Sequence, residues 1–118
     1  MSYMEWIIEK SLVCPVTGTG FSLAVAAKNL KLIIWYTGEY FLRTGTVIHI
    51  SKKVVTVNGK PVFVNILHIF PYTKELWQTL AQRILCPGNT NPLLQICNQM
   101  KTCKFTLCPY GAIQPRDL

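Results

Sequence analysis

The chain has 118 residues, of which 50% are hydrophobic and only 14% are charged. This composition excludes an intrinsically disordered protein, and the length predicts one compact domain over residues 1–118 with a loose tail from about residue 110. Twelve Lys and Arg against five Asp and Glu give a net charge of +7, and no acid occurs between Leu76 and Arg116. Such a charge favours an anionic partner, whether nucleic acid, anionic lipid or acidic protein.

The N-terminal residues, MSYMEWIIEK, lack the basic start and long apolar run of a secretory signal. We therefore expect an intracellular protein, cytoplasmic or nuclear and not secreted, whose five cysteines are reduced thiols. The longest apolar stretch, residues 21–36, is interrupted by Lys28, Asn29 and Lys31. It is too short and too polar at its centre to cross a bilayer, so no membrane span is predicted.

Two helices are predicted in the first third of the chain. Ser2 is a suitable cap for a helix over residues 3–13, which the Cys14-Pro15 dipeptide then ends. Ser22 can cap a second helix, in which apolar residues between Leu23 and Ile34 recur at helical spacing.

Three residues, Lys28, Lys31 and Trp35, fall on a different face of the second predicted helix from its apolar stripe. A basic and aromatic strip of this kind can contact a phosphate backbone or an acidic protein. The alternative is a solvated lysine face beside a half-buried tryptophan, which is ordinary on helices.

Residues 46–70 carry the strongest local signal, two β-branched apolar runs joined by Asn58-Gly59. This dipeptide favours a two-residue type I′ hairpin turn, because both of its residues need positive φ. The register of such a hairpin places His49 opposite His68. The alternative is a turn at Ser51-Lys52-Lys53, which produces a three-stranded meander and separates the two histidines.

A third helix is predicted over residues 74–85, capped by Thr73 and carrying a clear apolar stripe. A loop, a short helix over residues 93–100 and an edge strand over residues 104–107 follow. The predicted fold class is α+β, with a small antiparallel hairpin or meander packed against about three helices in a single domain.

Two groups of residues are candidates for chemistry. Neighbouring His49 and His68 would titrate as a coupled pair, which suggests a pH sensor or a metal pair; the alternative is two half-exposed strand residues. Four cysteines suggest a zinc site, although their spacing lacks close Cys-x-x-Cys pairs and also fits small buried thiols. These cysteines are Cys86, Cys97, Cys103 and Cys108. We expect no cofactor, with zinc as the one alternative.

Enzymatic activity is not predicted. The only acids are Glu5, Glu9, Glu39, Glu75 and Asp117, and no nucleophile elbow, phosphate-binding loop or zinc-protease motif occurs. A Cys-His nucleophile remains an open alternative, because such residues meet in space and not in sequence.

The function predicted from these features is that of a small, basic, non-enzymatic interaction module. It would be a regulatory or accessory protein that binds a protein partner through an apolar and basic surface. Viral accessory proteins are often compact, poor in acids and without enzyme motifs, so a viral source is one interpretation. Self-association into a homo-oligomer is a related expectation. One alternative is nucleic-acid binding, and another is a zinc-stabilised domain. The residues expected to bind a partner or nucleic acid are Lys28, Lys31, Trp35, Lys52, Lys53 and Lys60.

Overall fold

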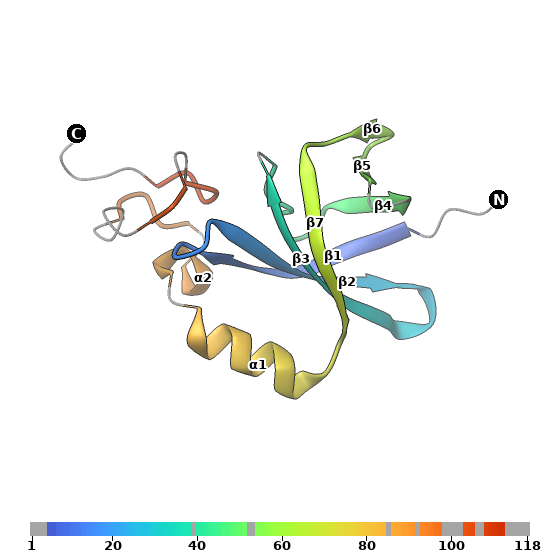
Figure 1. Ribbon diagram of the computed structural model, residues 1–118, viewed down its shortest axis with the longest axis horizontal. Helices are drawn as coiled ribbons and strands as arrows, with labels where there is room; N and C mark the ends of the chain where they lie inside the picture. Colours follow the sequence, from blue (N-terminus) through green and yellow to red (C-terminus); the bar gives the residue numbers. More distant parts are fainter. Residues whose placement is uncertain are drawn as a thin grey trace.

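Seven antiparallel strands form one sheet in the computed structural model, which describes residues 5–38, 40–51, 54–84, 86–91, 93–97, 103–105 and 108–112 (Figure 1). The strand order is β6-β5-β4-β1-β2-β3-β7. The elements are β1 (Glu5–Cys14), β2 (Thr19–Ala26), η1 (Ala27–Asn29), β3 (Leu30–Gly38), β4 (Val47–Ser51), β5 (Val54–Val57), β6 (Lys60–Pro61), β7 (Val64–Pro71), α1 (Lys74–Arg83) and α2 (Pro87–Thr90). The predicted α+β fold, with a hairpin or meander under three helices, is therefore wrong.

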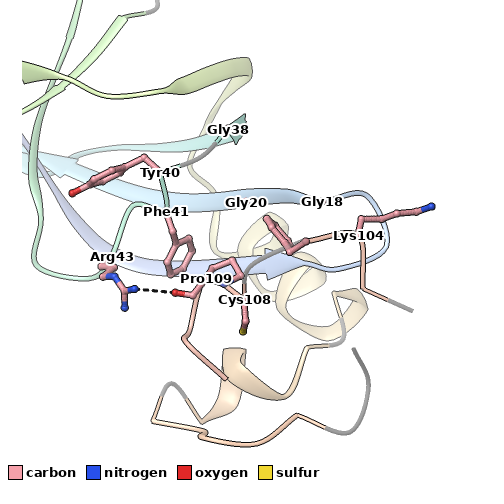
Figure 2. A pocket seen from close by; sticks show the side chains of 10 residues that line it. Gly18, Gly20, Gly38, Tyr40, Phe41, Arg43, Lys104, Cys108 and Pro109 are labelled. Atoms are coloured by element: carbon pink, nitrogen blue, oxygen red, sulfur yellow. Dashed lines mark hydrogen bonds between the residues drawn. The ribbon is translucent and has the colours of Figure 1, made fainter. Parts of the chain in front are cut away.

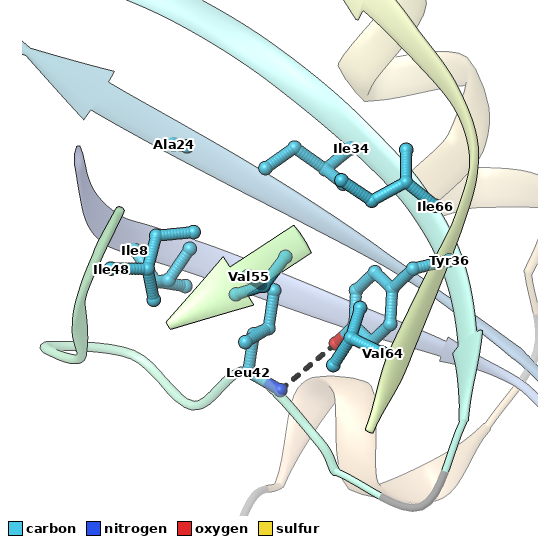
Figure 3. Close-up of a cluster of buried hydrophobic side chains, with 9 residues drawn as sticks. All are labelled: Ile8, Ala24, Ile34, Tyr36, Leu42, Ile48, Val55, Val64 and Ile66. Carbon is cyan, nitrogen blue, oxygen red and sulfur yellow. Dashed lines mark hydrogen bonds between the residues drawn. The ribbon is translucent and has the colours of Figure 1, made fainter. Parts of the chain in front are cut away.

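The sheet curls, so that β5 and β7 come together around one apolar interior (Figure 3). Val62, between β6 and β7, donates its backbone N–H to the carbonyl oxygen of Val55 at 3.0 Å. Removal of this interior from water is the main force that holds the curl, at about 25 cal/mol per Å² of apolar surface. Its nine buried residues are Ile8, Ala24, Ile34, Tyr36, Leu42, Ile48, Val55, Val64 and Ile66.

A second core lies on the outer face of the sheet, where α1 packs (Figure 1). The Thr73 side chain caps α1 by accepting a hydrogen bond from the Leu76 N–H at 3.1 Å. The helix predicted over residues 74–85 is thereby confirmed over Lys74–Arg83. The buried residues of this second core are Leu12, Leu23, Ile33, Trp77 and Ile84.

The helix predicted over residues 3–13 is wrong for residues 5–13, which belong to β1; residues 3 and 4 lie outside the described residues. A register shift between Ile8 and Lys10 marks a β-bulge, after which the strand alternation changes phase. Ile8 and Ser11 both face the interior, the first in the apolar core and the second hydrogen-bonded to buried Ser22. Their spacing of three residues imitates the period of a helix, which explains the error.

The second predicted helix is also wrong, since its residues form β2, η1 and β3. In β3, Ile33 belongs to the outer core and Ile34 to the inner one, so the strand is buried on both faces and shows no polar alternation. The turn before it contains neither Gly nor Pro. Instead Lys28 and Asn29 adopt positive φ values of 63° and 58°.

The turn at Asn58-Gly59 is confirmed, since β5 and β6 pair across it and both turn residues have positive φ. The prediction of one continuous hairpin over residues 46–70 is wrong. The chain reverses after Ser51, and β4 then pairs with β5, with Ile50 opposite Val55. The meander weighed against the hairpin is therefore the arrangement present.

The C-terminal segment has little regular structure where the model describes it. α2 is a single turn that begins at Pro87, a residue suited to the first helical position. The helix predicted over residues 93–100 is wrong for residues 93–97, and no strand forms at residues 103–105; the remainder of both predictions lies outside the described residues. Within the described ranges, no helix has the length and apolar character needed to cross a bilayer.

A buried polar network joins the loop after β3 to strands β1 and β2. The Tyr36 hydroxyl oxygen accepts hydrogen bonds from the Leu42 N–H at 3.0 Å and from the Ser22 hydroxyl at 3.2 Å. The Ser11 hydroxyl lies 2.8 Å from that of Ser22 and donates to the Leu42 carbonyl. Burial raises the pKa of Tyr36 from 10.0 to about 12, and the two hydrogen bonds oppose this shift only in part.

We expect the free energy of unfolding to fall at alkaline pH through Tyr36. Because its pKa is higher in the folded state, the stabilisation is fully present below pH 10.0 and is lost as the pH rises through about 12. A shift of this size corresponds to about 2–3 kcal/mol. Urea unfolding of the wild type and of Tyr36→Phe, from neutral pH to pH 12, measures the contribution.

Tyr36→Phe should already be about 1–3 kcal/mol less stable at neutral pH, because the buried Leu42 N–H loses its acceptor. Its stability should then decline less steeply with alkaline pH than that of the wild type. Equal declines in the two proteins would assign the alkaline effect to other groups.

Candidate functional site

A pocket of about 830 Å³ lies between one end of the sheet and the C-terminal segment (Figure 2). The β1–β2 turn and the start of β2, the end of β3 with the loop after it, and the C-terminal segment each supply part of its wall. Segments that are far apart in the sequence thus meet at one place. The described lining residues are Gly18, Gly20, Gly38, Tyr40, Phe41, Arg43, Lys104, Phe105, Cys108 and Pro109.

Three glycines of the pocket wall lie where a Cβ atom would meet a neighbouring group. A Cβ atom on Gly20 would lie 2.7 Å from the Tyr36 ring, and one on Gly38 would collide with the carbonyl oxygen of Phe63. At Gly18, φ is +70° and a Cβ would lie 3.2 Å from the Cβ of Lys104. The close packing behind the pocket therefore requires residues without side chains at these positions.

Two cations stand at opposite ends of the pocket, Arg43 and Lys104 (Figure 2). An Arg43 Nη donates a hydrogen bond to the carbonyl oxygen of Pro109 at 3.0 Å, and its guanidinium carbon lies 5.9 Å from the centre of the Phe41 ring. Lys104 is exposed, and its backbone N–H donates to the carbonyl oxygen of Pro15 at 2.7 Å. None of the described lining residues is acidic.

The C-terminal wall of the pocket is fixed to the sheet by Asn89 and Tyr110. The Asn89 side chain accepts from the Val13 N–H at 2.8 Å and donates to the Val13 carbonyl at 3.1 Å. The Tyr110 hydroxyl donates to Asn89 Oδ1 at 2.6 Å, and the Tyr110 ring meets Phe41 edge to face at 5.3 Å. Burial raises the pKa of Tyr110, and the nearby Cys86 thiol raises it further.

None of the predicted partner-binding lysines that the structure describes lines this pocket. Lys28 lies in the β2–β3 turn, while Lys31 lies in β3 with its ammonium 5.2 Å from the centre of the Tyr72 ring. Lys60 lies in the edge strand β6. The other two predicted lysines, Lys52 and Lys53, fall outside the described residues.

Trp35 belongs to an aromatic row on the outer face of the sheet. Its ring stacks on Phe21 of β2 at 5.9 Å with an interplanar angle of 4°. On its other side, Trp35 is opposite His68 of β7, whose ring lies 4.5 Å from that of Phe70. The indole N–H is buried and has no hydrogen-bond partner among the described residues. This row places Trp35 among aromatic neighbours.

The prediction that His49 and His68 are cross-strand neighbours is wrong. His49 in β4 is opposite Thr56 of β5 and Glu5 of β1, and three strands separate β4 from β7 in the sheet order. The physical reason is the chain reversal after Ser51, which pairs β4 with β5 in place of β7. The cross-strand histidine pair predicted from the sequence therefore does not form.

The four C-terminal cysteines are free thiols. Cys86 precedes α2, Cys97 is buried, and Cys108 lines the pocket. Burial raises the pKa of Cys86, and the Cys108 and Cys97 thiols add to the increase. In the part of the chain that the structure describes, no three His, Cys, Asp or Glu side chains are grouped to hold a metal ion.

Sequence reasoning did not identify the pocket, because its wall is assembled from distant segments. Gly18 and Gly20 were interpretable only as a turn, and Gly38 only as an interruption of a predicted helix. The absence of acids between Leu76 and Arg116 was visible, and it is the one sequence signal that relates to the cationic character of this site.

Comparison with known proteins identifies similar chains. The model of the IraM/PmrD family matches residues 4–78. The chain is 52% identical over 109 residues to the anti-adapter protein IraM of Citrobacter koseri, covering 92% of this chain and 96% of the relative. Its identity to the anti-adapter protein IraM of Escherichia coli K12 is 32% over 108 residues, covering 92% and 98%, and to that of Cronobacter sakazakii 30%, covering 91% and 97%.

The fold is also similar to that in the crystal structure of E. coli PmrD, with a TM-score of 0.60 at 16% sequence identity. The match covers 100% of the PmrD chain but only 70% of this one. The likeness is one of fold.

Proposed function

Because this chain belongs to the IraM/PmrD family, we propose that it is an anti-adapter, a regulatory protein that binds an adapter protein and opposes its action. The adapter is the protein partner, and binding, without chemical conversion, is the activity. The site proposed for binding includes the pocket between the curled sheet and the C-terminal segment. We place this activity in the bacterial cytoplasm.

Family membership confirms that the chain is a regulatory protein and not an enzyme. It also corrects parts of the sequence-based function. The relatives come from bacteria, so neither a viral accessory protein nor a nuclear location is supported. Nucleic-acid binding and self-association likewise find no support in the relatives, and a protein partner remains the favoured interpretation.

The observation that carries the proposal is the extent of the similarity. The alignment with the Citrobacter koseri anti-adapter covers 92% of this chain, although the family model ends at Gln78. It must therefore include most of the C-terminal segment, which provides Lys104, Phe105, Cys108 and Pro109 to the pocket. The likeness to anti-adapters thus extends over the part of the chain that closes the proposed site.

The proposal predicts a shared partner with a known anti-adapter. Tagged versions of this chain and of E. coli IraM would each be expressed in E. coli cells that lack their own IraM. Affinity purification and mass spectrometry should recover the same adapter with both baits, because the similarity covers nearly the full length of each chain. The purified adapter should then lose its ability to deliver its substrate when this chain is added in equimolar amount.

The tag alone and an unrelated basic protein of similar net charge serve as negative controls. An adapter recovered with E. coli IraM but not with this chain would contradict the proposal. So would a complex in which the adapter retains full activity, since binding without inhibition is not anti-adapter function.

A further inference from the structure

We propose that the pocket receives an acidic, partly apolar segment of the protein partner, with Arg43 and Lys104 as its two cationic anchors. The inference rests on the proposed function, because it assigns the surface and the chemistry by which the partner is bound. The pocket is not confined to the region that the family model matches, because part of its wall lies beyond that region. The wall residues concerned are Lys104, Phe105, Cys108 and Pro109.

The charges of the pocket wall determine the sign of the charge that the bound segment must carry. The described pocket wall contains Arg43 and Lys104 and no acid, within a chain of net charge +7. The Arg43 guanidinium is held by its hydrogen bond to the Pro109 carbonyl and by the Phe41 ring. A guanidinium that is already oriented loses less side-chain freedom when it binds a carboxylate, and its planar fork suits such a group.

The apolar residues of the pocket wall indicate that the bound segment also carries an apolar side chain. Phe41 lies between the two cations in the pocket, and Phe105 and Pro109 add further apolar wall (Figure 2). A segment with acids on both sides of an apolar residue would match the cations and the apolar wall together.

The small number of cations favours a polypeptide as the occupant. Nucleic acid needs a track of several cations along its phosphates, and the described wall holds two. We therefore assign the pocket to an acidic peptide segment.

A binding titration with synthetic peptides tests this assignment without the partner itself. The probe is a short peptide in which Asp and Glu flank a Leu-Phe core, and its matched controls replace the acids with Asn and Gln or with Lys. Backbone NMR of the full chain should show the acidic peptide shifting the amide signals of Gly18, Gly20 and Gly38. Affinity should fall at least about tenfold with the neutral peptide, since each carboxylate loses a charge-assisted contact.

Charge-reversal variants link the titration to the two anchors. Arg43→Glu with Lys104→Glu should weaken binding of the acidic peptide at least about tenfold. Lys74→Glu, which makes the same single charge reversal as Lys104→Glu but at an exposed position of α1, should change it less than about twofold. Lys104→Glu alone keeps the pocket wall intact, because only the backbone of Lys104 is hydrogen-bonded to Pro15. It should therefore fold normally and still bind less tightly.

Several results would overturn the inference. In the peptide titration, these are equal affinities for the acidic and neutral peptides, or amide shifts that map away from the pocket. In the variants, it is a loss of affinity in Lys74→Glu as large as that in the double anchor variant. Tighter binding of a single-stranded oligonucleotide at the same amides would also overturn it. If the variant altered at both anchors captured the adapter as well as the wild type, the pocket would not be the docking site, although the anti-adapter function would stand. If the acidic peptide bound the pocket but no adapter was captured, the anti-adapter function would be wrong and the pocket assignment would remain.

Discussion

Replacement of Gly38 by alanine is expected to lower the free energy of unfolding by more than about 3 kcal/mol. Gly38 has a φ of +141°, where a residue with a side chain is strained. Its added Cβ would also collide with the carbonyl oxygen of Phe63 and lie 3.1 Å from the Cα of Val64. These are backbone atoms of the segment that enters β7, so they cannot move without disturbing the pairing of Gly38 with Val64.

Gly45→Ala is the matched control for this effect. Gly45 also has a positive φ, +90°, but nothing lies within 4 Å of a Cβ at that position. The free energy of unfolding of the Gly45→Ala variant should therefore fall by only about 1–2 kcal/mol, because backbone strain is the one cost. Chemical denaturation of both variants separates the two causes, and an equal loss in both would show that the β3–β7 junction yields to the added atom.

Local chemistry is sufficient to predict the elements whose signals lie within a few neighbouring residues. Thr73 caps α1, and the Asn58-Gly59 turn forms, because a cap and a type I′ turn depend on the dihedral angles and hydrogen bonds of adjacent residues. Both features were therefore predictable without knowledge of the rest of the fold.

The strands predicted as helices depend instead on partners that are distant in the sequence. The bulge after Ile8 brings Ser11 to the interior, so the inward residues of β1 have a spacing typical of a helix. In β3, Ile33 faces the layer formed with α1 and Ile34 faces the interior. A strand covered on both faces has no polar alternation, and an apolar run of this kind does not distinguish a helix from a strand.

The candidate site was less predictable than the fold, for a related reason. Arg43 and Lys104 are isolated basic residues in the sequence, and neither has a neighbouring motif. Their meeting in one pocket results from the loop after β3 and from the C-terminal segment, which is fixed to β1 through Asn89. The site consequently depends on how the C-terminal segment is anchored, and removal of the Asn89 side chain gives the second large prediction.

Replacement of Asn89 by alanine is expected to destabilise the protein by about 2–4 kcal/mol. The Asn89 side chain satisfies the N–H and carbonyl of Val13, donates to the Ile84 carbonyl at 3.4 Å and accepts from the Tyr110 hydroxyl. Its loss leaves all four groups without this partner at the end of β1. Urea unfolding measures the loss, and hydrogen exchange at the Val13 amide should accelerate more than exchange at Ile33 in the core.

Asn91→Ala provides the control, since Asn91 is exposed in the same loop and its hydrogen bonds to Pro87 and Leu94 use backbone atoms only. It should change stability by less than about 0.5 kcal/mol. If the Asn89 anchor also holds the C-terminal wall of the pocket, Asn89→Ala should weaken the acidic peptide even at temperatures where the variant is fully folded. Full affinity in a folded Asn89→Ala variant would show that the wall remains in place through the packing of Tyr110 against Gly88 and Phe41.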